Sequence, residues 1–148
     1  MTYEELIAAT AAKIGLEGFA PDDDGVCVLQ SDVGEIAILS CTDPLDCVLL
    51  NASVADVPAA ADAALLAALK ANNGFLDMHG ATLAVDAETN RFELSQYAFL
   101  ADLDADSFVA MIERFAASLV DMRKKIEGAK VLKIIAPRSG EGFHGVTK

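Results

Sequence analysis

The chain has 148 residues, 53% of them apolar, and its formal net charge at pH 7 is −12. This length suits a single domain with a substantial core. The acidic balance argues against nucleic acid and anionic membrane as partners, because both would repel the protein. No apolar run is long enough to span a bilayer, and Glu4 and Glu5 stand where a secretory signal would carry cations. We therefore expect a cytoplasmic protein.

Charge is unevenly distributed along the chain. Residues 1–122 hold 21 acidic and four basic side chains, whereas residues 123–148 hold seven basic and two acidic ones. We expect one domain over residues 1–127 and a basic, flexible C-terminal tail over residues 128–148. The basic run at 123–125 lies where cations favour a helix C-terminus, and docking of an acidic partner is the alternative.

The three cysteines, Cys27, Cys41 and Cys47, are odd in number and lie in apolar segments. This favours buried thiols in a reducing compartment over a disulfide framework. A small cysteine enzyme would need a histidine base held by packed structure. His144 lies in the expected tail, and the residues around His79 offer no support. The cysteine spacings do not match a zinc site, so we expect no catalytic residue, no metal and no cofactor.

The N-terminal half predicts one helix and three strands. Thr2 and Glu5 have the spacing of a capping box and Gly15 is a stop signal, so we expect a helix over residues 3–14. Three apolar runs follow, separated by short turns that contain Gly, Pro or Asp. Because the turns are short, the strands should form an antiparallel meander. The expected strands cover residues 26–30, 35–41 and 46–54.

The C-terminal half predicts a second helix, two strands and a long final helix. Asp56 and Pro58 form a start signal for a helix over residues 58–71, where eight of the fourteen residues are alanine. The strands and the final helix cover residues 81–86, 91–99 and 105–126. The order α-β-β-β-α-β-β-α predicts an α+β fold, with a twisted antiparallel sheet covered by helices.

Residues 91–126 carry the most specific pattern. The strand alternates, with Phe92 and Leu94 on one side and Tyr97 and Phe99 on the other. In the helix after it, apolar residues recur every three or four positions and form one stripe. They are Phe108, Met111, Ile112, Phe115, Leu119, Met122 and Ile126.

Alternating acids lie between this strand and the helix. Asp102, Asp104, Asp106 and Glu113 have the spacing of a calcium loop. The loop's sharp turn needs glycine, however, where this chain has Ser107, and a strand instead of a helix precedes it. We therefore favour Asp104 as the N-cap of the helix and keep a calcium-binding module as an alternative.

Over residues 2–126 the chain resembles the Tir-chaperone family, the class I type III secretion chaperones of bacteria. The element order, the small size and the acidic pI of about 4.3 are similar. The opening helix ends in K-I-G-L, from Lys13 to Leu16. The strand, the Leu-Asp break and the long helix form a unit that runs from Phe92 to Ile126.

The resemblance implies a homodimer without enzymatic activity or cofactor, which binds the N-terminal segment of secreted effectors in extended form and keeps it competent for export. The secretion ATPase is a further candidate partner. Effector contacts are implied on the first helix and first three strands, at Leu6, Ile7, Ile14, Val26, Val28, Ile36 and Ile38. The implied dimer contacts are Leu65, Leu66, Leu69, Phe75, Leu83 and Val85.

Two alternatives stay open for these residues and for the function. Leu6 and Ile7 are adjacent, so their side chains diverge by about 100° on a helix, and we expect one of the two to face a client. Ordinary core is the alternative for the named strand residues, since alternate positions must face the helices. The alternative to a secretion chaperone is a protein-binding or regulatory module of the same fold without a secretion role.

Overall fold

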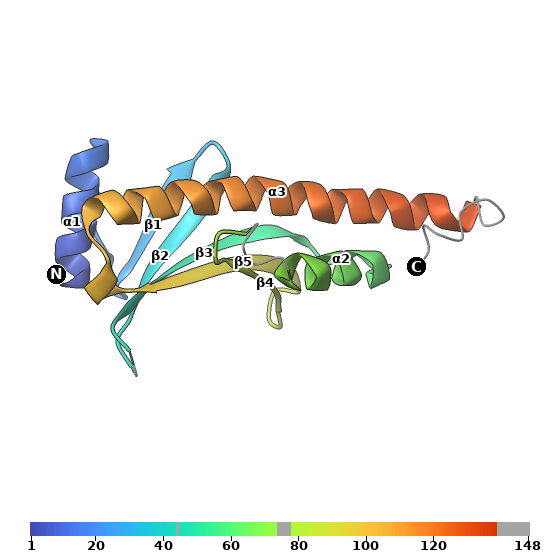
Figure 1. Ribbon diagram of the computed structural model, residues 1–148, viewed down its shortest axis with the longest axis horizontal. Coiled ribbons are helices and arrows are strands. Elements are labelled where there is room, and N and C mark those ends of the chain that lie inside the picture. The colour runs from blue at the N-terminus through green and yellow to red at the C-terminus, as the bar shows by residue number, and fades with distance from the viewer. Residues whose placement is uncertain (44, 74–77, 139–148) are drawn as a thin grey trace.

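The computed structural model describes residues 1–43, 45–73 and 78–138 (Figure 1). The elements follow the predicted order, and a short 3-10 turn, Leu100–Asp102, precedes the last helix. Their bounds are α1 Tyr3–Ile14, β1 Val26–Ser31, β2 Gly34–Cys41, β3 Cys47–Asp56, α2 Asp62–Asn73, β4 Thr82–Asp86, β5 Arg91–Phe99 and α3 Ala105–Arg138. The predicted α+β class is thereby confirmed.

The five strands form one antiparallel sheet in the order β1-β2-β3-β5-β4. The first three form the expected meander, and a two-residue turn joins Ser31 to Gly34. β5 pairs with β3, and β4 pairs with the far side of β5. A bulge interrupts β3 between Ser53 and Ala55. The sheet therefore has two edges, β1 and β4.

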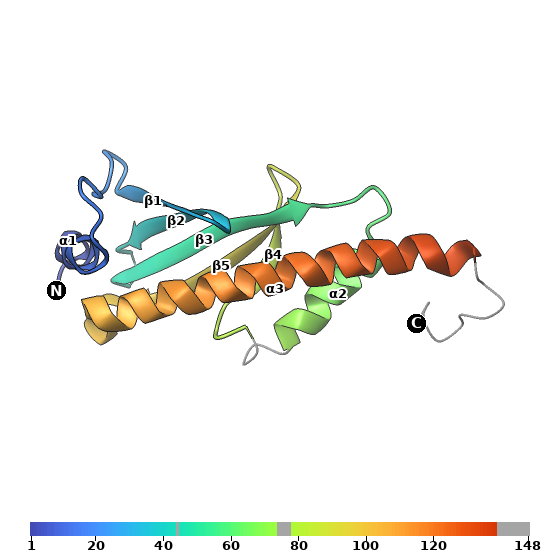
Figure 2. The same cartoon turned by 90° about the horizontal axis from the view of Figure 1, so that it is seen from above.

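The helices all lie on one face of this sheet. α3 runs along that face, with α1 near one end of it and α2 beside it near the other end (Figures 1 and 2). Ile38, Leu50 and Leu94 point to this inner face and are fully buried. All seven residues of the predicted α3 stripe are buried against them. Among the described residues, no helix covers the opposite face of the sheet (Figure 2).

α1 begins and ends as predicted. Thr2 Oγ1 accepts a hydrogen bond from the Glu5 N–H and Glu5 Oε2 accepts one from the Thr2 N–H, which closes the capping box. Leu6 and Ile7 are 0% and 1% exposed, so the expectation that one of them faces outward is wrong. The physical reason is that α1 lies between two other elements and has both adjacent faces covered.

Polar contacts of α1 show both neighbours. The Tyr3 hydroxyl donates to the Ile38 carbonyl of β2 at 3.0 Å. Lys13, near the other end of α1, pairs with Asp106 in the first turn of α3. The helix is thus held between the sheet and α3.

α2 begins later than predicted, at Asp62 instead of residue 58. Asp56 does not cap it but ends β3 and accepts from Arg91. The Val57 N–H donates to the Asn90 carbonyl, which keeps the chain extended past the end of β3. The residue before a proline also avoids helical backbone, so Pro58 holds Val57 in the same state.

α3 ends later than predicted. It continues past residue 126 to Arg138, so the first part of the segment expected as a flexible tail is helical. Residues 139–148 of that expected tail lie outside the described residues. Within the described chain, no helix combines the length and the apolar character that crossing a bilayer requires.

Candidate functional site

The face of the sheet opposite α3 carries apolar side chains on four adjacent strands. Val26 pairs with Leu39, Leu39 with Leu49, and Leu49 with Tyr97, so these four side chains form one row across the sheet. With Val28 and Phe99 on the same face, we call this set the outer sheet face: Val26, Val28, Leu39, Leu49, Tyr97 and Phe99. An uncovered apolar surface of this kind is typical of a binding site.

The aromatic pair on β5 is its most prominent part. Tyr97 is 62% exposed, and its ring meets the Phe99 ring edge-on, with centroids 5.9 Å apart and planes at 80°. Edge-to-face packing fixes the two rings against each other. The pair therefore presents large apolar area that is already ordered before a partner arrives.

The two edges of the sheet differ in how accessible their backbones are. At β4, the Asn72 side chain of α2 accepts from the Leu83 N–H at 2.7 Å and donates to the Leu83 carbonyl at 2.6 Å. This amide occupies the place of a further strand. At the start of β1, Asp22 Oδ1 accepts from the Val26 N–H, and the Asp22 backbone N–H donates to the Val26 carbonyl.

Beyond Val26, no part of the chain that the structure describes makes such a contact with the β1 edge. Backbone groups alternate in direction along a strand, so the N–H and carbonyl of Val28 and Gln30 point away from β2, as those of Val26 do. Val28 is also 47% exposed on the outer sheet face. β1 thus offers both backbone groups and an apolar side chain to an extended peptide.

The seven predicted effector residues separate into two groups. Val26 and Val28 lie on the outer sheet face, and Ile14 is exposed at the end of α1. The other four, Leu6, Ile7, Ile36 and Ile38, are in the core, so the alternative of an ordinary core role describes them in this structure. Only Val26, Val28 and Ile14 of the seven are accessible to an effector.

The predicted dimer residues gather on α2 and β4. Leu65, Leu66 and Leu69 are exposed on α2 and Val85 is exposed on β4, whereas Leu83 is buried. Phe75 lies outside the described residues. α2 turns its alanines inward, at Ala64, Ala68 and Ala71, so its bulky side chains face away from the core.

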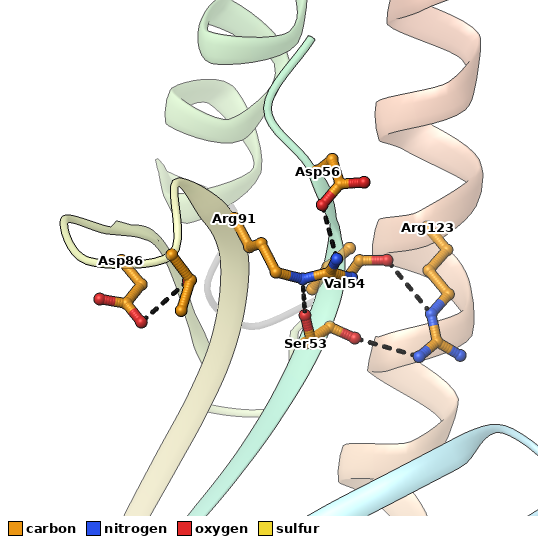
Figure 3. Close-up of polar contacts among 7 residues, drawn as sticks. Ser53, Val54, Asp56, Asp86, Arg91 and Arg123 are labelled. Carbon is orange, nitrogen blue, oxygen red and sulfur yellow. Dashed lines mark hydrogen bonds and ion pairs between the residues drawn. The ribbon is translucent and has the colours of Figure 1, made fainter.

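Two arginines hold the bulged end of β3 from two sides (Figure 3). Arg123 of α3 donates to the carbonyls of Ser53 and Val54, and to Val33 in the β1–β2 turn. Arg91 of β5 donates to the Ser53 hydroxyl at 2.6 Å and pairs with Asp56. Arg123 therefore has a structural role at the sheet, which neither reading of the basic run foresaw.

Among the alternating acids, Asp104 caps α3, as predicted. Its Oδ1 accepts from the Ser107 N–H at 2.8 Å, and its own N–H donates to Ser107 Oγ at 3.0 Å. Hydrogen bonds from Ser107 to the ionised carboxylate, first of all from its backbone N–H, lower the pKa of Asp104. Across the described ranges, no three His, Cys, Asp or Glu side chains gather as a metal site would require.

The cysteines depart in part from the expected burial. Cys27 and Cys47 are buried, but Cys41 is exposed, so the prediction of a buried thiol there is wrong. Cys41 follows the last inward side chain of β2 and points to the outer face. Burial raises the pKa of both Cys27 and Cys47.

Sequence reasoning did not assign Leu39, Leu49, Tyr97 and Phe99 to a site. Alternation along each strand placed Tyr97 and Phe99 on one face together, which was the available signal. The alternation alone does not show which of the two faces the helices cover. The pairing register across β2, β3 and β5 supplies the missing connection.

The comparisons with known proteins agree on the type of protein. The model of the Tir chaperone protein (CesT) family matches residues 5–123. The family comprises chaperones and not enzymes, in agreement with the expectation of a protein without catalytic activity. No curated protein matches the chain.

Solved structures share the fold at low sequence identity. A chain of the ExsC–ExsE complex is 19% identical with a TM-score of 0.69, over 82% of this chain and 90% of that one. A chain of the HopA1–SchA chaperone–effector complex is 20% identical with a TM-score of 0.64, over 84% and 93%. A chain of the heterodimeric ExoU–SpcU complex from the type III secretion system of Pseudomonas aeruginosa is 21% identical with a TM-score of 0.64, over 80% and 96%.

Proposed function

The chain belongs to the Tir chaperone protein (CesT) family, and on that premise we propose that it is a cytoplasmic homodimeric chaperone that holds the N-terminal segment of a secreted effector in extended form. The observation that carries this proposal is the outer sheet face, which adjoins the open part of the β1 edge. The solved structures that share this fold include a chaperone–effector complex, HopA1–SchA. Three free cysteines suit a reducing cytoplasm.

The β1 edge supplies the means to bind an extended client. A client strand placed beside β1 would pair with the outward backbone groups of Val28 and Gln30, and backbone pairing does not depend on client sequence. The β4 edge is the poorer site because Asn72 already satisfies Leu83. The client strand therefore belongs at β1.

The outer sheet face supplies apolar contacts for client side chains. A segment that leaves the β1 edge and crosses β2, β3 and β5 would meet Leu39, Leu49 and Tyr97 in turn, because these lie in one row. Residues 1–122 carry 21 acidic and four basic side chains, so a client segment with basic flanks would be attracted. The client is thus an apolar, basic-flanked segment that lacks stable structure when free.

The leucines of α2 supply the dimer contact. Leu69 is 69% exposed, and Leu65 and Leu66 are exposed beside it. Such large side chains on an otherwise slim alanine helix would pack against a second copy. Light scattering should find a dimer for the natural protein and a monomer for Leu69→Asp. Leu16→Asp, which changes an exposed leucine at the end of α1, should leave the dimer intact.

A proline substitution tests the client edge. Proline is tolerated on an edge strand where its missing N–H would face solvent, so Val28→Pro should leave the β1–β2 pairing in place and remove the donor offered to a client. Val28→Thr keeps that donor and is the control. The tagged protein is purified from the native host during active secretion, and co-purifying proteins are identified by mass spectrometry.

We expect the natural protein and Val28→Thr to retain a secreted protein and Val28→Pro to lose it. Recovery of a partner that is not secreted would instead favour the regulatory module without a secretion role. A gene neighbourhood that lacks both export components and an effector would point the same way. Equal recovery by all three proteins would refute binding at the β1 edge.

A further inference from the structure

Cys41 and Cys47 face each other at the end of the β2–β3 pair. They are direct partners in the antiparallel register, and both are free thiols. Cys41 is exposed to solvent, whereas Cys47 is buried. Cys47 in turn pairs with Phe99 on β5, so the two sulfurs lie in the row that borders the outer sheet face.

The strand register places the two cysteines at a separation that a disulfide can span. Antiparallel partners have Cα atoms roughly 4.5–5.5 Å apart, and disulfides join Cα atoms roughly 4.4–6.8 Å apart. The Cys41 thiol donates to the Asp43 carbonyl at 3.9 Å, and Cys41 is close enough to Cys47 to contribute to the raised pKa of that thiol. A bond between them is therefore compatible with the pairing of the two strands.

The two thiols differ in how they meet an oxidant. Burial, with a smaller contribution from the neighbouring Cys41 thiol, raises the pKa of Cys47, which keeps that thiol protonated at neutral pH. Cys41 is the accessible sulfur and reacts first. Cys27 is buried beneath the Tyr3 hydroxyl, 3.7 Å from its sulfur, and should stay reduced.

We propose that Cys41 and Cys47 form an oxidisable dithiol, which hydrogen peroxide converts to an intrachain disulfide. Peroxide transfers one oxygen to the Cys41 sulfur, which becomes a sulfenic acid while one water leaves. The Cys47 sulfur then attacks the Cys41 sulfur, and the displaced hydroxyl leaves with the Cys47 proton as a second water. Two thiols and one peroxide thus give one disulfide and two waters.

The new bond would join β2 to β3 beside Phe99. That position is the rim of the outer sheet face, where the bond would fix the relative position of two strands that carry Leu39 and Leu49. The oxidised protein would therefore present the same apolar side chains, but with less relative motion between β2 and β3.

Thiol counting by mass spectrometry tests the proposal on the full-length protein. The protein is treated with a small excess of hydrogen peroxide, unfolded and labelled with N-ethylmaleimide. We expect one labelled cysteine, Cys27, instead of three, with a mass about 2 Da lower before labelling. A peptide map should link Cys41 to Cys47. The measurement needs no client, so its result is independent of the proposed function.

Cys41→Ser is the control, because it changes an exposed side chain and should fold normally. After the same treatment it should carry labels on Cys27 and Cys47. Disulfide-linked dimers through Cys41 would overturn the proposal. So would a Cys41 oxidised to sulfinic or sulfonic acid beside a Cys47 that still labels.

Discussion

The two faces of the sheet are built from the same strands, but one face is buried and the other is partly exposed. The inner face, with Ile38, Leu50 and Leu94, is sealed under α3 and is fully buried. The outer sheet face has an equally apolar row, but no helix of the described ranges lies above it, and Tyr97 is 62% exposed there. Folding therefore requires the first face and leaves the second free for binding. Substitutions on the two faces should separate stability from client capture.

The largest effect should come from the inner side. Phe115 is fully buried on α3, so Phe115→Ala should lower the free energy of unfolding by about 3–5 kcal/mol through lost burial and a cavity. Phe99→Ala, which removes the same ring from the outer sheet face, should cost less than about 1 kcal/mol. Urea denaturation of both variants measures the contrast. Similar losses would mean that the two faces are not distinct.

The Arg123 contacts should come next. Arg123→Met keeps much of the side-chain length but leaves the carbonyls of Ser53, Val54 and Val33 without their donor. We expect a loss of about 1.5–3 kcal/mol of unfolding free energy, the usual cost for hydrogen bonds to a charged group. Lys124→Met, at the exposed neighbouring position, should change it by less than about 0.5 kcal/mol. Equal effects would show that Arg123 acts as a surface charge.

The outer sheet face should show a smaller, selective effect. Tyr97→Ser should leave unfolding almost unchanged but weaken binding of an identified client segment by about 2 kcal/mol, since exposed aromatic anchors carry much of an interface. Isothermal titration calorimetry gives the affinity. Leu16→Ser, at an exposed leucine away from this face, should bind like the natural protein. Unaltered affinity of Tyr97→Ser would place the client elsewhere.

The smallest effect should be the charge of Asp104, and it depends on pH. Because hydrogen bonds from Ser107 lower the pKa of Asp104, its ionised form stabilises the folded state above the ordinary aspartate range. That contribution is lost as the pH falls through the lowered pKa. Asp104→Asn keeps a capping oxygen without the charge. It should unfold at lower urea than the natural protein at pH 7, and the difference should shrink as the pH falls through the lowered pKa of Asp104.

Local signals predicted much of this fold. The capping box fixed the start of α1, and the spacing from Phe108 to Ile126 identified every buried residue of that α3 stripe, because caps and helical period act over a few residues. The start of α2 was missed because the Val57–Asn90 hydrogen bond joins segments far apart in the chain.

The candidate site depended more on long-range pairing. Val26 and Val28 were identified, but Leu49 and Tyr97 join them through the strand register, which the sequence pattern alone does not contain. Leu6 and Ile7 were misjudged for a related reason. A spacing of about 100° between adjacent side chains turns one of them outward only where a single surface covers the helix. In the structure α1 has two neighbours, the sheet and α3, which cover adjacent sides of it.

The inward alanines of α2 have a consequence for its dynamics. Ala64, Ala68 and Ala71 bury little area, so packing within one protomer holds this helix more weakly than the phenylalanines hold α3. Local opening requires least energy where few apolar contacts are lost. In dilute protein, the amide hydrogens of α2 should therefore exchange faster than those of α1 and α3. Their exchange should become slower as the protein concentration rises, because dimer formation would then stabilise this helix.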